Sequence, residues 1–274
     1  VPWIGEWLQE LARGGHEISS ATLIGFYTIH TTVVPAVLIF FAALHFWRVR
    51  KAKGVVIPRR PGEAVDDKPA KVLFLPNLLL RETAVACLLV AVVLLISVLV
   101  NAPLGSEANP GMSPNPAKAP WYFLGFQELL LHFHPVIAVV LIPLAAVLFF
   151  ALIPYLRYGD VEGVWMMSNV GRSTGMAAVV FALVATPLLI VVDELRSASP
   201  DLSSGLSGII PLVVVAAVVA AFVFGIRRLM AAPRDEIVQA LVILLLTALV
   251  VLTVTGVWFR GAGMALVWPW EIGG

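Results

Sequence analysis

Two histidines lie fifteen residues apart inside an otherwise apolar stretch of the chain. His30 and His45 belong to GFYTIHTTVVPAVLIFFAALHFWRVR, residues 25–50, in which Arg48 is the first charged residue. An imidazole in hydrocarbon is costly unless it meets a partner, a cavity or a metal. In a helix this interval separates the rings by roughly 22 Å along the axis and about 60° around it. We therefore expect each histidine to ligate a different haem iron, the alternative being a hydrogen bond to a neighbouring helix.

The composition predicts which elements carry these histidines. The chain of 274 residues is 60% hydrophobic and 13% charged, whereas soluble domains are about 45–50% apolar and about 25% charged. No run shows the alternating pattern of a membrane β-barrel strand. The expected fold is an all-α integral membrane protein with about six transmembrane helices. Apolar runs of spanning length lie near residues 20–47, 83–100, 135–156, 173–192, 206–226 and 237–257.

The distribution of basic residues predicts how these helices are oriented. Lysine and arginine favour the cytoplasmic side of short loops, and one orientation places 14 of the 18 on that side, leaving Arg13, Lys118, Arg196 and Arg260 outside. Both the N-terminal segment and the C-terminus then face outward. The segment VPWIGEWLQELARGG is too short to span and has apolar residues on one side, which predicts a helix lying along the outer interface.

Charge and cysteine content exclude several classes of function. The net charge of +1 gives no sign of a nucleic-acid partner. Cys87 is the single cysteine, so disulfides and cysteine-ligated clusters within this chain are excluded. Near the ends of predicted helices, Asp193 and Glu194 are expected to be solvated. Trp268 and Trp270 are expected to anchor the tail at the outer interface.

The N-terminal third resembles a known family. IGEWLQELARGG, then ATLIGFYTIH, then a second histidine followed by RVRKAKG, is similar to cytochrome b of the bc1 and b6f complexes, with the fifteen-residue spacing of the b6 branch. The resemblance implies that His30 holds a low-potential haem b near the outer face and His45 a high-potential haem b near the inner face. It also implies that the opposite ligands come from helices missing here, in another chain or an unrepresented segment. Gly25 departs from the family pattern, in which many members have arginine.

The segment VLFLPNLLLRET resembles the family region beside the inner quinone-reduction site. Arg81 and Glu82 stand where the family has a lysine–aspartate pair, which implies proton uptake there during quinone reduction. The alternative is that Arg81 simply marks the cytoplasmic end of a transmembrane helix.

The segment PNPAKAPWYFLGFQELLLHFHP resembles the outer quinol-oxidation loop in the form found in bacterial menaquinol-type relatives. Trp121 and Tyr122 match the motif, but Pro120 replaces the glutamate that normally precedes the tryptophan. Glu128 lies seven residues beyond Trp121, about two helical turns on, and we expect it to be the substitute proton acceptor. A purely structural carboxylate is the alternative.

Two histidines in the same segment are rival proton carriers. His132 and His134 follow Glu128, and imidazole titrates near neutral pH. Solvated interface residues are the alternative for both histidines, and an ordinary interfacial aromatic belt is the alternative for the WYF motif.

The resemblance implies a subunit of a quinol–cytochrome c reductase in a bacterial inner membrane. Quinol near Gly5, Trp121, Tyr122 and Glu128 would be oxidised outside, and quinone near Arg81 and Glu82 would be reduced inside. A Rieske iron–sulfur protein, a c-type cytochrome and a dimeric complex are the implied partners, and no nucleic acid is expected.

The resemblance also divides the chain into three parts. Residues 1–50 are similar to the end of the haem-bearing half, residues 51–175 to the start of the quinone-site half, and residues 176–274 are additional helices. A dihaem anchor of another quinone-linked dehydrogenase, or a non-redox transporter or scaffold, are the alternative functions.

Overall fold

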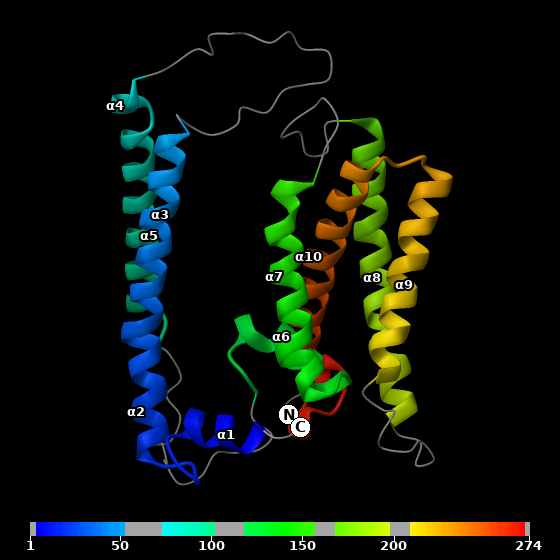
Figure 1. Cartoon of the computed structure of the whole chain (residues 1–274), viewed down its shortest axis with the longest axis horizontal. Coiled ribbons are helices and arrows are strands. Elements are labelled where there is room, and N and C mark those ends of the chain that lie inside the picture. Colours follow the sequence, from blue (N-terminus) through cyan, green and yellow to red (C-terminus); the bar gives the residue numbers. More distant parts are fainter. Residues whose placement is uncertain (1–3, 53–72, 102–117, 157–167, 198–208, 272–274) are drawn as a thin grey trace.

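The computed structural model describes residues 4–52, 73–101, 118–156, 168–197 and 209–271, and these residues are predominantly helical (Figure 1). Within these described residues, six helices are long and apolar enough to cross a membrane, which confirms the expected all-α membrane fold. The short amphipathic helix α1 (Gly5–Arg13) precedes them and bears the exposed residues Trp7 and Leu11. The spans are Ser20–Lys51 (α2, η1, α3), Phe74–Leu99 (α4, α5), Ile137–Tyr155 (η3, α7, η4), Asn169–Arg196 (in α8), Ile209–Leu229 (α9) and Arg234–Trp258 (α10).

Two of the spans contain a π-helical turn just before a proline. Turn η1 (Ile29–Val33) precedes Pro35, and η3 (Ile137–Leu141) precedes Pro143. Proline has no N–H to donate, and its ring clashes with the carbonyl four residues earlier. A local π turn moves that carbonyl away and lets the helix continue. Both prolines are thus accommodated within spans that remain continuous.

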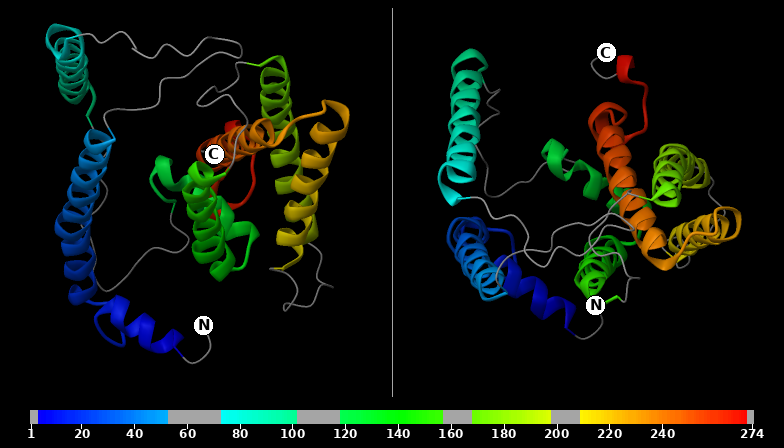
Figure 2. Two further views of the ribbon diagram at one scale, coloured as in Figure 1. Left: turned by 45° about the horizontal axis from the view of Figure 1, so that its top comes forward. Right: turned by 90° about the horizontal axis from the view of Figure 1, so that it is seen from above.

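The best-packed part of the protein is formed by α6 (Leu124–His132), α8 (Asn169–Ser197) and α10, with α9 alongside. In Figure 2, these helices lie apart from the α1–α5 half. Ala178 and Ala240 are completely buried, and the rings of Phe181 and Phe222 lie 4.8 Å apart. By contrast, the span windows of α2–α3 and α4–α5 contain no buried residue. These windows are therefore exposed on the surface of this chain.

Helices α8 and α10 are connected near their N-terminal ends by a small polar cluster. The Ser168 hydroxyl donates to Glu236 and accepts a hydrogen bond from the Gly171 N–H at 2.8 Å. Gln239 donates to the Gly171 carbonyl at 3.1 Å. Because this cluster joins residues early in both helices, α8 and α10 run parallel, with α9 returning between them in the chain.

Helix α6 crosses α10 at two glycines, where the backbones approach closely. A methyl group on Gly256 would lie 2.8 Å from Cβ of Leu124, and one on Gly125 would lie 2.6 Å from Oγ1 of Thr253. Small residues permit such crossings in membrane proteins. The crossing positions α6 across the end of α10, next to the C-terminal segment.

Replacing Gly256 with alanine is expected to destabilise the protein by about 1–3 kcal/mol, because Cβ of Leu124 cannot move without its backbone. The matched control is Gly225→Ala in α9, where an added methyl group meets no atom within 4 Å. Alanine favours a helix over glycine, so the control should be neutral or slightly stabilising. Unfolding in mixed detergent micelles measures both effects, and equal stabilities would contradict the close crossing.

Candidate functional site

The two predicted haem ligands lie on one continuous helix. His30 is in the π turn η1 and His45 is in α3 (Val34–Lys51), and both are exposed. A π turn contains more residues than an α turn, so the angular offset between the rings falls below the roughly 60° of an uninterrupted α-helix. Both imidazoles therefore lie on similar faces of the helix, near opposite ends of the span.

The surroundings of these histidines fit external haem ligation. Neither imidazole has a hydrogen bond to another residue in the described part of the chain, and the ring of His45 lies 5.8 Å from that of Phe46 between centroids. The nearby Thr28 and Thr31 hydroxyls donate hydrogen bonds to the backbone carbonyls four residues earlier. Two unpartnered imidazoles on an exposed face have the donor chemistry that iron in a haem requires.

The WYF motif forms a short 3₁₀ turn, η2 (Trp121–Phe123), that leads directly into α6. The preceding loop is fixed at two points: the Ala119 N–H donates to Gln127 at 2.7 Å, and Lys118 donates to the Val257 carbonyl at 3.4 Å. The rings of Trp121 and Tyr122 pack edge to face at 5.6 Å and remain mostly exposed. The hydrogen-bonded loop before η2 thus leaves the rings of Trp121 and Tyr122 exposed on the surface.

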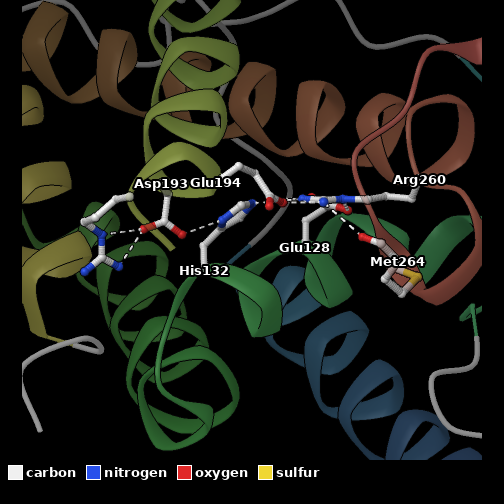
Figure 3. A network of polar contacts seen from close by, with 7 residues as sticks. Glu128, His132, Asp193, Glu194, Arg260 and Met264 are labelled. Atoms are coloured by element: carbon white, nitrogen blue, oxygen red, sulfur yellow. Dashed lines mark hydrogen bonds and ion pairs between the residues drawn. The ribbon is translucent and has the colours of Figure 1, made fainter. Parts of the chain in front are cut away.

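Glu128 is completely buried and forms a bidentate ion pair with Arg260, which follows α10 (Figure 3). Nε and Nη2 of Arg260 each donate to the carboxylate at 2.9 Å. The third guanidinium nitrogen, Nη1, donates to Glu194 and, at 3.0 Å, to the Met264 carbonyl. The tight turn from Arg260 to Leu266, with positive φ at Gly263 and Met264, brings that carbonyl back to Arg260.

His132 connects this ion pair to α8. Its Nδ1 lies 2.8 Å from Oδ2 of Asp193, while its Nε2 lies 3.3 Å from Nη2 of Arg260 and 3.5 Å from Oε2 of Glu128. The other oxygen of Asp193 accepts hydrogen bonds from Arg196 at 2.8 and 3.2 Å. We call Glu128, His132, Asp193, Glu194, Arg196 and Arg260 the α6 cluster.

The α6 cluster shifts the protonation of its members. Burial alone would raise the pKa of Glu128, but hydrogen bonds from His132 and Arg260 outweigh it and hold that pKa below its ordinary 4.5. Burial would lower the pKa of His132, but its contacts with Glu128 and Asp193 raise it above the ordinary 6.5. The cluster therefore favours a carboxylate at Glu128 and stabilises the protonated form of His132.

These two shifts predict an optimum in stability between about pH 4.5 and 6.5. The contribution of Glu128 is present above 4.5 and lost as pH falls through its lowered pKa. The contribution of His132 is complete below 6.5 and lost as pH rises through its raised pKa. Thermal unfolding in detergent across pH measures this, and His132→Gln should remove the decline on the alkaline side. An unchanged alkaline decline in that variant would contradict the prediction.

The other predicted site residues lie apart from the α6 cluster. Arg81 and Glu82 are exposed in the first turn of α5 (Leu79–Leu99), which begins at the end of the molecule opposite to α1 and α6 (Figure 1). Gly5 begins α1, at the same end as α6, and an added Cβ there would meet nothing within 4 Å. The structure thus places Trp121 and Tyr122 on η2 and Glu128 on the helix α6 that follows it directly, and leaves Gly5, Arg81 and Glu82 on other elements.

The sequence did not indicate four members of the α6 cluster, which are Asp193, Glu194, Arg196 and Arg260. Asp193 and Glu194 were expected to be solvated at a helix end, but the Asp193 side chain is 14% exposed and Glu194 contacts Arg260. Arg260 was expected only as an outward-facing basic residue, and it is 1% exposed. The one local signal was the glycine-containing turn after Arg260 in FRGAGM.

Comparison with known proteins shows what the N-terminal part of the chain is similar to. A family model described as cytochrome b(N-terminal)/b6/petB matches residues 1–120. Cytochrome b6 of Synechococcus sp. (strain CC9605) is 43% identical over 51 residues, which are 19% of this chain and 23% of that protein. Cytochrome b6 of Prochlorococcus marinus (strain NATL1A) is likewise 43% identical over 51 residues, with the same shares of both chains.

The match is partial. The chain spans about a quarter of the length of these curated relatives, and no solved structure matches it. The family model nevertheless covers α1, the histidine-bearing helix and α5 in their expected order. Residues 1–120 are therefore similar to the N-terminal part of cytochrome b and to cytochrome b6.

Proposed function

We propose that this chain is a cytochrome b-type subunit of a quinol–cytochrome c oxidoreductase. The observation that carries the proposal is the pair His30 and His45, fifteen residues apart on one exposed spanning helix within the segment that matches the family. Quinol, in particular menaquinol, is oxidised at the α6 end of the molecule, and quinone is reduced at the opposite end.

Residues of this chain would hold two haem b groups through His30 and His45. When bound, these groups supply one-electron transfer between the two membrane faces. The exposed faces of α2 (Ser20–Thr28) and α3 leave room for a second helix with the opposite ligands, from another chain or a segment not represented here. Burial against that helix also removes the cost of exposing an imidazole to lipid.

The outer quinol site is formed by Trp121, Tyr122 and Glu128, with Gly5 on α1 at the same end of the molecule. The anchored loop before η2 holds the two rings in place to contact a quinol head group. Glu128 gives this region a buried negative charge that Arg260 orients. Water is excluded from the carboxylate, which strengthens its electrostatic effect.

The inner quinone site is formed around Arg81 and Glu82. Reduction of a quinone takes up protons, and an exposed acid–base pair at the membrane edge suits that chemistry. Its place at the start of α5, at the end opposite to the α6 cluster, supports a separate site.

The complex would lie in a bacterial inner membrane, with the N-terminal segment and C-terminus on the periplasmic side. A Rieske iron–sulfur protein, a c-type cytochrome, the remaining cytochrome b helices and a second copy of the complex are the proposed partners. The excess of Lys and Arg on the other side of the spans supports this orientation.

A redox-titrated absorption difference spectrum of the purified complex tests the proposal. We expect two low-spin b-type components that menaquinol reduces, together with the paramagnetic signal of a Rieske centre. Two b-type components without a Rieske signal would favour a dihaem anchor of another dehydrogenase. A preparation of the intact complex with no b-type component would exclude both redox functions and favour a transporter or scaffold.

A further inference from the structure

We propose that His132, not Glu128, accepts a proton released by quinol oxidation, and that Asp193 passes it toward the surface while Arg260 holds Glu128 in its ionised form. This inference rests on the proposed function, since it assigns roles at the outer quinol site. It makes His132 a catalytic residue and Arg260 a positioning residue.

The contacts of Glu128 disfavour it as the acceptor. Its carboxylate is fully buried and receives hydrogen bonds from two nitrogens of Arg260, so a proton could bind only by displacing a charged donor. Charge-assisted bidentate pairs of this kind are among the strongest hydrogen-bonded contacts in proteins. A carboxylate held in this way is a weak base.

The two nitrogens of His132 differ in their contacts. In the neutral imidazole that donates Nδ1–H to Asp193 at 2.8 Å, Nε2 carries the lone pair and accepts from Nη2 of Arg260 at 3.3 Å. That contact is longer than the hydrogen bonds between Arg260 and Glu128 and is the weakest of those that Arg260 makes. A proton can therefore add at Nε2 by displacing only this one donor, and Oε2 of Glu128 at 3.5 Å offsets the new charge.

The groups that face His132 from every packed element support this role. Glu128 lies on its own helix, Asp193 faces it from α8, and Arg260 faces it from the segment after α10. Arg196 and Glu194 are one contact further away, through Asp193 and Arg260. Two carboxylates and one guanidinium thus contact the imidazole. Their combined charge is negative, which favours one additional positive charge on His132.

The exposure of the side chains rises along the path. Glu128 is 0% exposed, His132 is 8% and Asp193 is 14%, and Arg196 beyond it is 22%. A proton that binds Nε2 lets the Nδ1 proton move to Oδ2 of Asp193, from which it passes to water. The path leads from the buried ion pair to the protein surface.

The step balances as follows. Oxidation of one quinol breaks two O–H bonds and releases two protons and two electrons, which the iron–sulfur partner and the b-haem chain accept one each. One proton forms an N–H bond at Nε2 of His132 while the Nδ1–H bond breaks toward Asp193, and the other proton passes directly to water. Asp193 then releases its proton to water, and exchange of the imidazole protons with water restores the Nδ1–H tautomer before the next turnover.

The test is the pH dependence of menaquinol oxidation by the intact complex. Because the acceptor must be unprotonated, the wild-type rate should rise with pH through a single midpoint. His132→Gln should lower the rate about 100-fold, within the range of general-base catalysis, and abolish that midpoint. Asp193→Asn removes a negative charge beside the imidazole and should move the midpoint to lower pH.

The matched control is His134→Gln, two residues further on. His134 is exposed and its Nδ1 accepts only the Val136 N–H, at 3.3 Å, so rate and midpoint should remain those of the wild type. A purely structural role for the cluster would lower rates in His132→Gln and Asp193→Asn without moving the midpoint, and that outcome overturns the proposal.

Two further outcomes keep the tests separate. If His132→Gln does not assemble with haem, the pH profiles of Asp193→Asn and of the wild type test the role of His132. A wild-type rate that does not fall at low pH overturns the inference. If the wild-type complex does not oxidise quinol at all, the proposed function itself fails. If the complex oxidises quinol but the midpoint of its pH profile is the same in both variants as in the wild type, only the role of His132 is refuted.

Discussion

Replacing Arg260 with methionine is expected to destabilise the protein by about 3–5 kcal/mol, the usual effect of removing one partner of a buried ion pair. The loss is large because Glu128 is fully buried and would keep its charge without its main donor. Glu194 and the Met264 carbonyl would also lose their contact with Nη1. Unfolding in mixed detergent micelles measures the effect.

A double-mutant cycle identifies the cause. The second variant, Glu128→Gln, leaves Arg260 with a neutral partner, and the combined change Glu128→Gln with Arg260→Met should cost clearly less than the sum of the two. Arg228→Met is the control, because Arg228 is an exposed arginine at the end of α9 that lies over the Phe224 ring. We expect a change below about 1 kcal/mol there. Additive losses in the cycle would mean that the two residues act independently.

Replacing His30 or His45 with alanine is expected to remove one of the two b-haem components from the complex, a different one in each variant. Each haem needs both of its axial ligands, and the two histidines lie near opposite ends of one span, too far apart to serve the same iron. Redox-titrated difference spectra of the two variants measure this. Quinol-driven reduction should be impaired in both.

The control for this pair is His16→Ala. His16 lies outside the spanning helix, its side chain is 87% exposed, and it pairs with Glu10 at 2.7 Å. Both haem components should be retained there. If both components persist in His30→Ala and in His45→Ala, these histidines are packing residues and the cytochrome b function proposed above must be withdrawn.

The α6 cluster combines buried ion pairs and candidate proton carriers in one place. Helix α6, the end of α8 and the segment after α10 meet through charged side chains rather than through apolar packing. In the proposed path, these charged contacts favour His132 over Glu128 as the proton acceptor. Variants in this cluster therefore need a readout of stability and one of proton transfer.

The transmembrane helices could be predicted from the sequence, because length and hydrophobicity alone decide whether a segment spans a bilayer. All six spans were found within a few residues, except that the second begins at Phe74 and includes charged Arg81 and Glu82. His30 and His45 could also be predicted as functional, because an imidazole within hydrocarbon requires a specific reason at its own position. The prediction that they ligate haem still awaits its experiment.

The partners of Glu128 were decided only by the tertiary structure. Arg260 is 132 residues away in the chain and Glu194 is 66 residues from Arg260, and no periodicity within one helix connects them. Charged residues near helix ends are solvated by default, so the sequence favoured exposure. The crossing of α6 over α10 at Gly125 and Gly256 closes that region, and a buried charge must then find a partner of opposite sign. Sequence determined the helices and their histidines, whereas packing determined the ion pair and with it the candidate proton path.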